Sequence, residues 1–310
     1  MKSLLRFFVF RFLLRTIWIG LLATFGIQLL LTFLPPKRVI DTESTSGNQR
    51  MIVRQWKTAN YVDWLGNLLK GNLQVTDNPS GNWLAREIRV RSSNTLTLCW
   101  NAFLIAALMG IFAGTTKATL NSEHVSGPKK ALSTILSSAS TTILFVLSSV
   151  PAYIIAYFLF LLLKSQSNMF LAVIALAMGS GLAMDVARLT TNIHQRELYS
   201  KYVENALTCG LKTSGFIPVP GSVGWHAFRN SLITVLPITA YRLPLIVSSA
   251  LVVEVVFDLP GLGESLLSAL IQQDTPMILT IILISVLFVQ VCVFLADVLA
   301  YALHPQRYSG

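Results

Sequence analysis

Long apolar stretches are the feature that most limits what this chain can fold into. Six of them occur, at about residues 8–34, 95–115, 132–163, 169–187, 232–253 and 277–303. A helix rises 1.5 Å per residue, so about 20 residues cross the roughly 30 Å hydrocarbon core of a bilayer. Lipid offers no partner to backbone N–H and C=O groups, and the stretches lack the alternation of a membrane β-strand. The sequence therefore predicts an all-α, polytopic membrane protein with about six transmembrane helices.

The charged residues are few, and their distribution predicts an orientation. Only 12% of the 310 residues are charged, although the net charge is +10, whereas soluble domains have about 25%. Most Lys and Arg residues lie in the segments between the apolar stretches, and those of the shorter segments favour a cytoplasmic N-terminus over a nucleic-acid-binding patch as the explanation of the charge. With an even number of spans, both termini are expected in the cytoplasm. The basic residues of segment 35–94 count against this, but a segment of that length weakens the charge rule.

The pattern of polar segments predicts two parts. Residues 1–94 are expected to form a first transmembrane helix, retained because no signal cleavage site follows it, plus an extracytoplasmic loop. Residues 95–310 form the transmembrane core, and its largest cytoplasmic loop, 188–231, is interrupted by the Gly and Pro cluster GFIPVPGSVG. Pro151 predicts a kink in the third stretch. An amphipathic helix, with Pro260 before it and Pro276 after it, is expected at the outer interface.

Several segments resemble a known family. They are NTLTLCWNAFLIAALMGIFAG, VPAYIIAYFLFLLL, ARLTTNIHQRELYSKYVENALTCGL, FRNSLITVLPI, VVEVVFDLPGLGESLLSALIQQDTP and LADVLAYALHPQRY. From Asn94 to the end the chain resembles the dipeptide, oligopeptide and nickel permease family of ABC importers, with a weaker match over residues 1–93. The resemblance implies an ABC importer type I permease-like fold in the bacterial inner (cytoplasmic) membrane.

The resemblance also implies a function and partners. The chain would form the translocation pathway for peptides or a related small solute, and it would pair with a second homologous permease subunit. One or two ATP-binding subunits would hydrolyse ATP, and a periplasmic or lipid-anchored solute-binding protein would deliver the substrate. Within that family the substrate ranges over dipeptides, oligopeptides, antimicrobial peptides, nickel chelates and haem, and the sequence does not select one of these.

The same resemblance places an ATPase-coupling loop, the EAA motif, in the long cytoplasmic segment. The matching positions are Glu204, Asn205, Ala206, Gly210 and Leu211, with Asn205 in place of one alanine. Such a loop needs a short helix that leaves the membrane and then turns sharply at a glycine. The sequence departs from the family pattern in the Pro-rich stretch from Phe216 to Val223. A diverged or dedicated ATPase partner is one hypothesis for this departure.

Arg242 and Asp185 are the candidate residues of the translocation pathway. Arg242 lies inside the fifth stretch, where an arginine at helix centre costs about 2.5–3.5 kcal/mol on insertion scales. It could line the pathway and meet an anionic group of the substrate, or it could pair with Asp185 or extend to the inner face. Asp185 and Arg188 are three residues apart, so they are also expected to neutralise one another. Asp297, at a matching family position, is expected to fix the sixth span among its neighbours.

Motifs for chemistry are absent from the sequence. It has no G-x-x-x-x-G-K-[ST] phosphate-binding loop, no H-E-x-x-H motif and no G-x-S-x-G elbow. The three cysteines, Cys99, Cys209 and Cys292, are scattered and predict neither a disulfide framework nor a metal site. We therefore expect no catalytic residue, metal or cofactor, and a partner that supplies the energy. An ion-coupled secondary transporter is one alternative, although the chain has few intramembrane acidic residues and no evident internal repeat. A membrane-embedded enzyme is another, for which only Arg242 and Asp185 are candidate polar groups.

Overall fold

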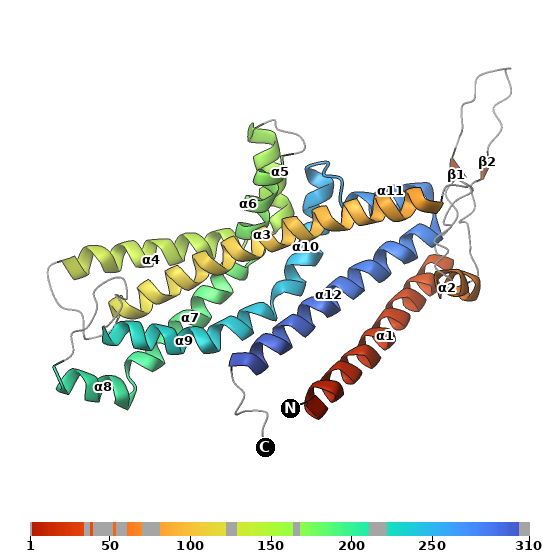
Figure 1. Ribbon diagram of the computed structural model, residues 1–310. Helices are drawn as coiled ribbons and strands as arrows, with labels where there is room; N and C mark the ends of the chain where they lie inside the picture. The colour runs from red at the N-terminus through yellow and green to blue at the C-terminus, as the bar shows by residue number, and fades with distance from the viewer. Residues whose placement is uncertain are drawn as a thin grey trace. The chain divides into compact units, whose positions relative to one another are not determined.

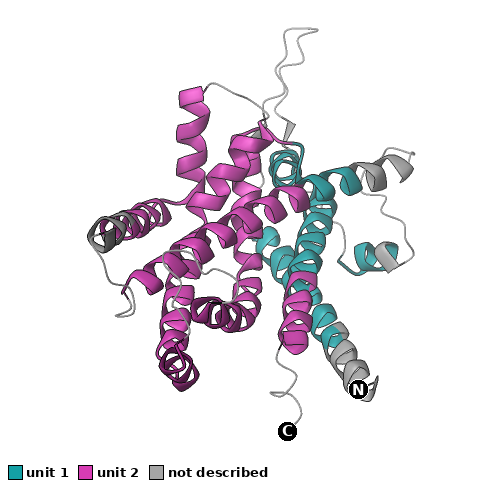
Figure 2. Ribbon diagram, turned by 60° about the vertical axis from the view of Figure 1, so that its left-hand side comes forward, with its two compact units in different colours: residues 1–94, 260–290 teal, residues 95–259, 291–310 magenta. Residues whose placement is uncertain are grey.

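The computed structural model describes residues 2–33, 38–39, 52–53, 61–69, 81–121, 129–163, 168–210 and 222–303. The chain forms two compact units, coloured separately in Figure 2. Unit 1 comprises residues 1–94 and 260–290, and unit 2 comprises residues 95–259 and 291–310. These units are defined by which helices pack together. The division into residues 1–94 and 95–310 was made from the sequence pattern, and it stays a prediction.

Unit 1 is built from helices and one small β-ladder. Its elements are α1 (Lys2–Thr32), β1 (Arg38–Val39), β2 (Ile52–Val53), α2 (Tyr61–Leu69), the beginning of α3 (Gly81–Asn121), α11 (Leu262–Gln272) and the first part of α12 (Thr275–Leu303). The two strands pair antiparallel, with Arg38 opposite Val53. Tyr61 and Trp64 join α2 to the long helices, because the Tyr61 hydroxyl lies 2.9 Å from Thr24 Oγ1 and Trp64 donates to Thr280.

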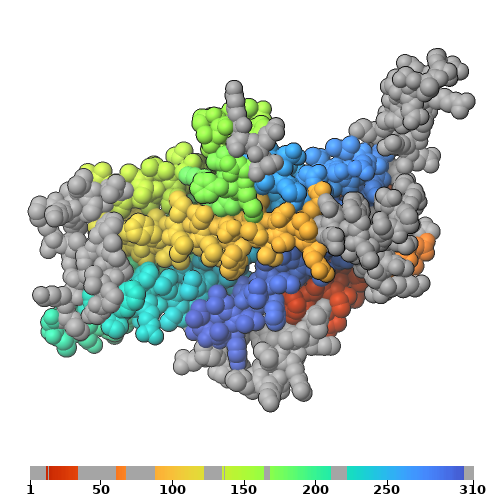
Figure 3. All heavy atoms as spheres, turned by 45° about the horizontal axis from the view of Figure 1, so that its top comes forward, coloured from red at the N-terminus to blue at the C-terminus, as the bar shows by residue number. Residues whose placement is uncertain are grey.

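Unit 2 is a helical bundle, shown with unit 1 in Figure 1. Besides the remainders of α3 and α12 it contains α4 (Lys129–Ser148), α5 (Ala152–Leu163), α6 (Met169–Gly179), α7 (Leu182–Leu198), α8 (Lys201–Thr208), α9 (Val223–Ala240) and α10 (Leu243–Val256). Figure 3 shows α4, the later part of α3 and α9 as neighbouring bands on one face. The core of the bundle includes Leu176 of α6, Val235 of α9 and Ile246 of α10, which are fully buried.

The all-helical membrane architecture is confirmed, and the form of three spans is corrected. Within the described chain, Leu14–Thr32, Ile88–Asn121 and Thr275–Leu303 are single helices long and apolar enough to cross a membrane. The other three expected spans are pairs of helices, α4 with α5, α6 with α7 and α9 with α10, bent by 95°, 47° and 48°. Up to six spans are thus present if each bent pair is one span.

The first bent pair is more than the kink that the sequence predicts. The helix stops at Ser148 and a new one begins at Ala152, directly after Pro151. Pro151 cannot donate a backbone hydrogen bond, and its carbonyl instead accepts from the amides of Ile154 and Ile155 in the first turn of α5. The third apolar stretch is therefore two helices that meet almost at a right angle (Figure 1).

Small residues let α3 and α7 approach closely. A Cβ atom added at Gly114 would lie 2.5 Å from the Ala187 carbonyl oxygen, and one added at Gly110 would lie 2.6 Å from the Ala183 oxygen. Close approach of backbones is a common way to pack helices in lipid, where apolar side chains gain little from leaving the solvent. This close contact holds α3 against α7, the helix that precedes α8.

Candidate functional site: the α8 loop and an ion pair at two helix breaks

Helix α8 is a short amphipathic helix that directly follows α7 in unit 2. Ser200, in an extended conformation, precedes it, and the Ser200 carbonyl accepts from the amides of Val203 and Glu204. Val203 is buried in a cluster with Leu198, Val223 and Ala227, against which Ala206 and Leu207 also pack. One face of α8 is thereby fixed to the ends of α7 and α9.

The opposite face of α8 carries the first of the predicted coupling residues. Glu204 and Asn205 are exposed, and Ala206 is half-buried at the edge of the packed face. Glu204 lies in the first turn of the helix, where a negative side chain is favoured by the helix dipole. The structure therefore brings Glu204, Asn205 and Ala206 together on a firmly seated helix.

The chain turns sharply after α8 at Gly210. This residue has φ = +82°, a left-handed conformation that is strained for residues with a Cβ atom. Its amide donates to the Leu207 carbonyl, 3.0 Å away, and closes the last turn. Leu211 and residues 216–221 of the Pro-rich stretch lie outside the described residues.

Tyr202 connects α8 to α7 and α9 through its hydroxyl. It donates to the Glu197 carboxylate at 2.8 Å and accepts from the Asn230 amide at 3.2 Å. Partial burial, together with the hydrogen bond to Glu197, raises the pKa of Tyr202, so the phenol stays neutral at physiological pH and can act as the donor. These three residues come from separate segments, and no local sequence signal links them.

A buried histidine, His194, lies on α7 near the contacts that hold α8. His194 on α7 is fully buried, and its Nδ1 lies 2.9 Å from the Ser231 hydroxyl on α9. Ser231 in turn donates to the Ala227 carbonyl, so the pair is anchored to α9 close to the cluster that holds α8. His194 lies in segment 188–231 and its partner is 37 residues away, so no local sequence signal links the two.

Arg242 and Asp185 form an ion pair between two helix breaks. Arg242 Nη1 lies 3.3 Å from Asp185 Oδ2, and the two side chains are 47% and 45% exposed. Arg242 occupies the N-cap position of α10, where α9 ends, so it is not at the centre of a continuous helix. Asp185 lies in the first turn of α7, just after Gly181. The pairing that the sequence offered as one interpretation of Arg242 is present in the structure.

Arg188 has a different contact from the one expected. Its guanidinium lies over the Phe145 ring, 5.6 Å from the centroid, whereas the Asp185 carboxylate is engaged by Arg242. Asp297 receives a hydrogen bond from the Tyr241 hydroxyl, which ties α12 to the break between α9 and α10. Tyr241 and Arg242 are adjacent, so both residues of this break are held by carboxylates.

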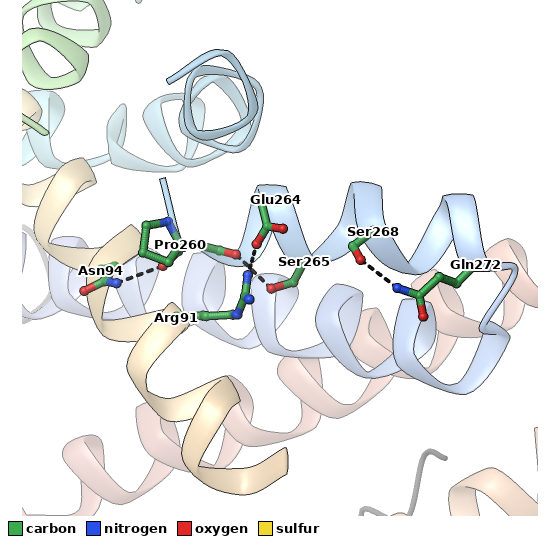
Figure 4. A network of polar contacts seen from close by, with 8 residues as sticks. Arg91, Asn94, Pro260, Glu264, Ser265, Ser268 and Gln272 are labelled. Atoms are coloured by element: carbon green, nitrogen blue, oxygen red, sulfur yellow. Dashed lines mark hydrogen bonds and ion pairs between the residues drawn. The ribbon is translucent and has the colours of Figure 1, made fainter. Parts of the chain in front are cut away.

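Unit 1 carries a separate polar network at α11, shown in Figure 4. Arg91 near the start of α3 pairs with Glu264 in the first turn of α11, and the Asn94 amide donates to the Pro260 carbonyl at 2.8 Å. These contacts join residues 91–94 of α3, a helix that begins at Gly81 and not at the expected residue 95, to the start of α11. The expected amphipathic helix is present, with Leu262 and Ala269 buried and Leu267 and Ile271 exposed.

No metal-binding cluster is found in the part of the chain that the structure describes. Groups of three or more His, Cys, Asp or Glu side chains that could hold an ion do not occur there. The cysteines of this part are free, with Cys99 and Cys292 buried and Cys209 exposed beside Gly210.

The α8 loop and the ion pair both lie in a region that matches a known protein family. Residues 125–307, more than half of the chain, match the family described as the binding-protein-dependent transport system inner membrane component. The chain belongs to this family. The matched region contains α8, Asp185, Arg242 and Asp297, whereas residues 1–94 lie outside it. The family is one of membrane components of transport systems, as the resemblance implied.

Relatives of this inner membrane component are transport permeases. The chain is 24% identical over 266 residues to the oligopeptide transport system permease protein AppB of Bacillus subtilis, covering 79% of each chain. It is 25% identical over 282 residues to the metal-staphylopine import system permease protein CntB of Staphylococcus aureus, covering 89% of this chain and 84% of that protein. A Brucella abortus protein that carries the name of a peptide transport system permease is 31% identical over 126 residues, and the match spans only 38% of its length.

Proposed function

We propose that the chain is the permease subunit of an ATP-driven ABC importer and forms the translocation pathway for peptides or a related small solute. The observation that carries the proposal is α8, a helix seated by Val203 whose opposite face exposes Glu204 and Asn205 within the family match. The names of AppB and CntB support a substrate of the peptide or metal-chelate class. The chain itself is non-catalytic in this proposal, and separate subunits hydrolyse ATP.

In the proposed coupling step, α8 docks against the ATP-binding subunit. Force on a helix that is packed through Val203, and bonded through Tyr202 to Glu197 and Asn230, passes to α7 and α9 together. Both helices end at breaks, one next to Gly181 and the other at Arg242. Movement at such breaks lets packed segments rotate as rigid bodies and exposes a pathway to one side at a time.

The ion pair between Asp185 and Arg242 is the proposed polar element of the pathway. Ionisable side chains within membrane spans generally face the bundle interior or a water-filled cavity. Both side chains are about half exposed at breaks where two spans change direction. In this proposal they face the pathway, the termini and residues 188–231 are cytoplasmic, and the membrane is the bacterial inner membrane. A second permease and a solute-binding protein complete the importer.

Reconstitution tests the proposal directly. The permease pair, its ATPase and its binding protein are placed in proteoliposomes, and uptake of a labelled peptide is measured with ATP, with vanadate, and with an imposed proton or sodium gradient. We expect uptake that requires ATP and stops with vanadate. Uptake driven by an ion gradient without ATP would instead establish a secondary transporter.

A pair of matched variants tests the role of α8. Glu204→Ala removes an exposed carboxylate from the first turn of α8, and Asp63→Ala removes an exposed carboxylate from the first turn of α2. Each change costs a similar helix-dipole term of about 0.3–1 kcal/mol. We expect only Glu204→Ala to reduce co-purification of the ATPase and ATP-dependent uptake. Equal results for the two variants would remove α8 as the coupling element.

A further inference from the structure

A basic pocket lies between α3, α4 and α7 in unit 2. Its volume is about 170 Å³, and its lining residues are Lys117, Thr141, Met184, Ala187, Arg188, Thr191 and Asn192. Two cations and three neutral polar side chains thus surround one space, and none of the lining residues is acidic. None of the predicted site residues lines it.

The two cations are not neutralised by carboxylates among the described residues. The nearest acid along α7 is Asp185, and its carboxylate is engaged by Arg242. The contact of Arg188 is with the Phe145 ring, which leaves the N–H groups around the edge of the guanidinium available. Lysine and arginine whose donors converge on one pocket favour an anion with several acceptor oxygens.

The pocket changes from apolar to polar along its length. Met184 of the lining lies toward the start of α7, next to its break, and Phe145, which is not a lining residue but lies under the Arg188 guanidinium, is toward the end of α4. Both are on the side of the apolar spans. Asn192, near the end of α7, and Lys117, near the end of α3, are on the side of the loops. Contact of Thr191 with the Gly114 carbonyl, at 3.2 Å, confirms that these two ends lie together.

We propose that this pocket binds the phosphate group of an anionic membrane lipid. A phosphate accepts hydrogen bonds from Lys117, Arg188 and Asn192, while the glycerol and first acyl carbons contact Met184 and the Phe145 ring. The polar end lies at the cytoplasmic ends of the spans, so the lipid belongs to the inner leaflet, where basic pockets between helices are suited to anionic headgroups. This assignment of leaflet rests on the orientation in the proposed function. Free phosphate offers the same oxygens but leaves the apolar end without an occupant.

Native mass spectrometry of the purified full-length permease in detergent tests the proposal, with phosphatidylglycerol, phosphatidylcholine and inorganic phosphate as probes. We expect phosphatidylglycerol to bind more tightly than phosphatidylcholine. Lys117→Gln or Arg188→Gln should weaken its binding about 5-fold, and the double variant about 30-fold. Arg188→Lys, which keeps the charge, should retain most of the binding, and Arg229→Gln, an exposed arginine on α9 outside the pocket, should retain all of it.

Several results would overturn the lipid site. They are equal affinity for the two lipids in the wild-type protein, an equal loss in the Arg229→Gln control, displacement of the lipid by millimolar inorganic phosphate, or displacement by a free peptide with a carboxylate terminus. The last result would make the pocket a substrate subsite. Retention of the thermal midpoint in each variant shows that folding is intact. Binding needs no ATPase, so a failure of transport leaves this measurement unaffected.

Discussion

At the scale of single residues, Gly210 is a position where the backbone itself favours glycine. Its φ of +82° follows directly after α8, and a Cβ atom there meets nothing within 4 Å. Gly210→Ala therefore introduces conformational strain of about 1–2 kcal/mol without a steric clash. We expect it to loosen the end of α8 and to lower ATP-dependent uptake while membrane insertion stays normal. Uptake by the reconstituted importer, at matched protein levels, measures this.

Gly66→Ala is the matched control for that substitution. Gly66 lies in α2, and an added Cβ atom also meets nothing within 4 Å, but its φ is not positive. Alanine in the middle of a helix is favoured over glycine by roughly 0.5–1 kcal/mol. The control should therefore transport normally. Normal uptake by Gly210→Ala as well would show that the turn after α8 has no part in coupling.

The ion pair between Arg242 and Asp185 allows stability and transport to be separated. A pair that is about half exposed contributes only about 0.2–1 kcal/mol, so removing either partner should change the thermal midpoint little. We expect Arg242→Ala to reduce uptake strongly and Arg242→Lys to reduce it less, because the pathway loses a cation only in the first case. Thermal unfolding and uptake are measured on the same preparations.

The reversed pair tests what Arg242 contacts during transport. Asp185→Arg combined with Arg242→Asp preserves an attraction between the two helix breaks. If Arg242 serves only to pair with Asp185, the double variant should recover wild-type uptake. We expect it to keep the wild-type thermal midpoint but not to recover uptake, because the positive charge that would meet an anionic group of the substrate is moved from Arg242 to position 185 on α7.

At the scale of helices, close approach of α3 and α7 holds the segment that leads to α8. Gly114→Ala places a Cβ atom 2.5 Å from the Ala187 carbonyl oxygen and 2.7 Å from Thr190 Cβ, so the helices must separate. Overpacking of this kind costs about 1–3 kcal/mol. We expect a lower thermal midpoint in detergent. Gly26→Ala, on α1 with nothing within 4 Å, should leave the midpoint unchanged or raise it, and equal midpoints for both variants would contradict the packing.

Among the helices, the sequence predicts the positions of the spans but not the breaks within them. Apolar length located all six stretches, because span length depends only on composition over about 20 residues. It did not reveal that three stretches are bent pairs: Pro151 indicated only a kink in the third stretch, and the contacts of Tyr241 and Arg242 at the break before α10 are with Asp297 and Asp185, which are distant in sequence. Likewise the resemblance to the family predicts Glu204 and Gly210 as coupling residues, whereas the contact of His194 with Ser231 had no local signal.

At the scale of the whole molecule, coupling to a cytoplasmic ATPase depends on which side of the membrane α8 faces. The natural cysteines offer a test, because Cys209 is exposed one residue before Gly210 while Cys99 and Cys292 are buried. A membrane-impermeant maleimide should therefore react at a single position. We expect no labelling of intact cells and strong labelling of inside-out vesicles, and Cys209→Ser should abolish the signal. Labelling in intact cells would place α8 outside, where no cytoplasmic ATPase could reach it, and the coupling proposal and the leaflet of the lipid site would both be wrong.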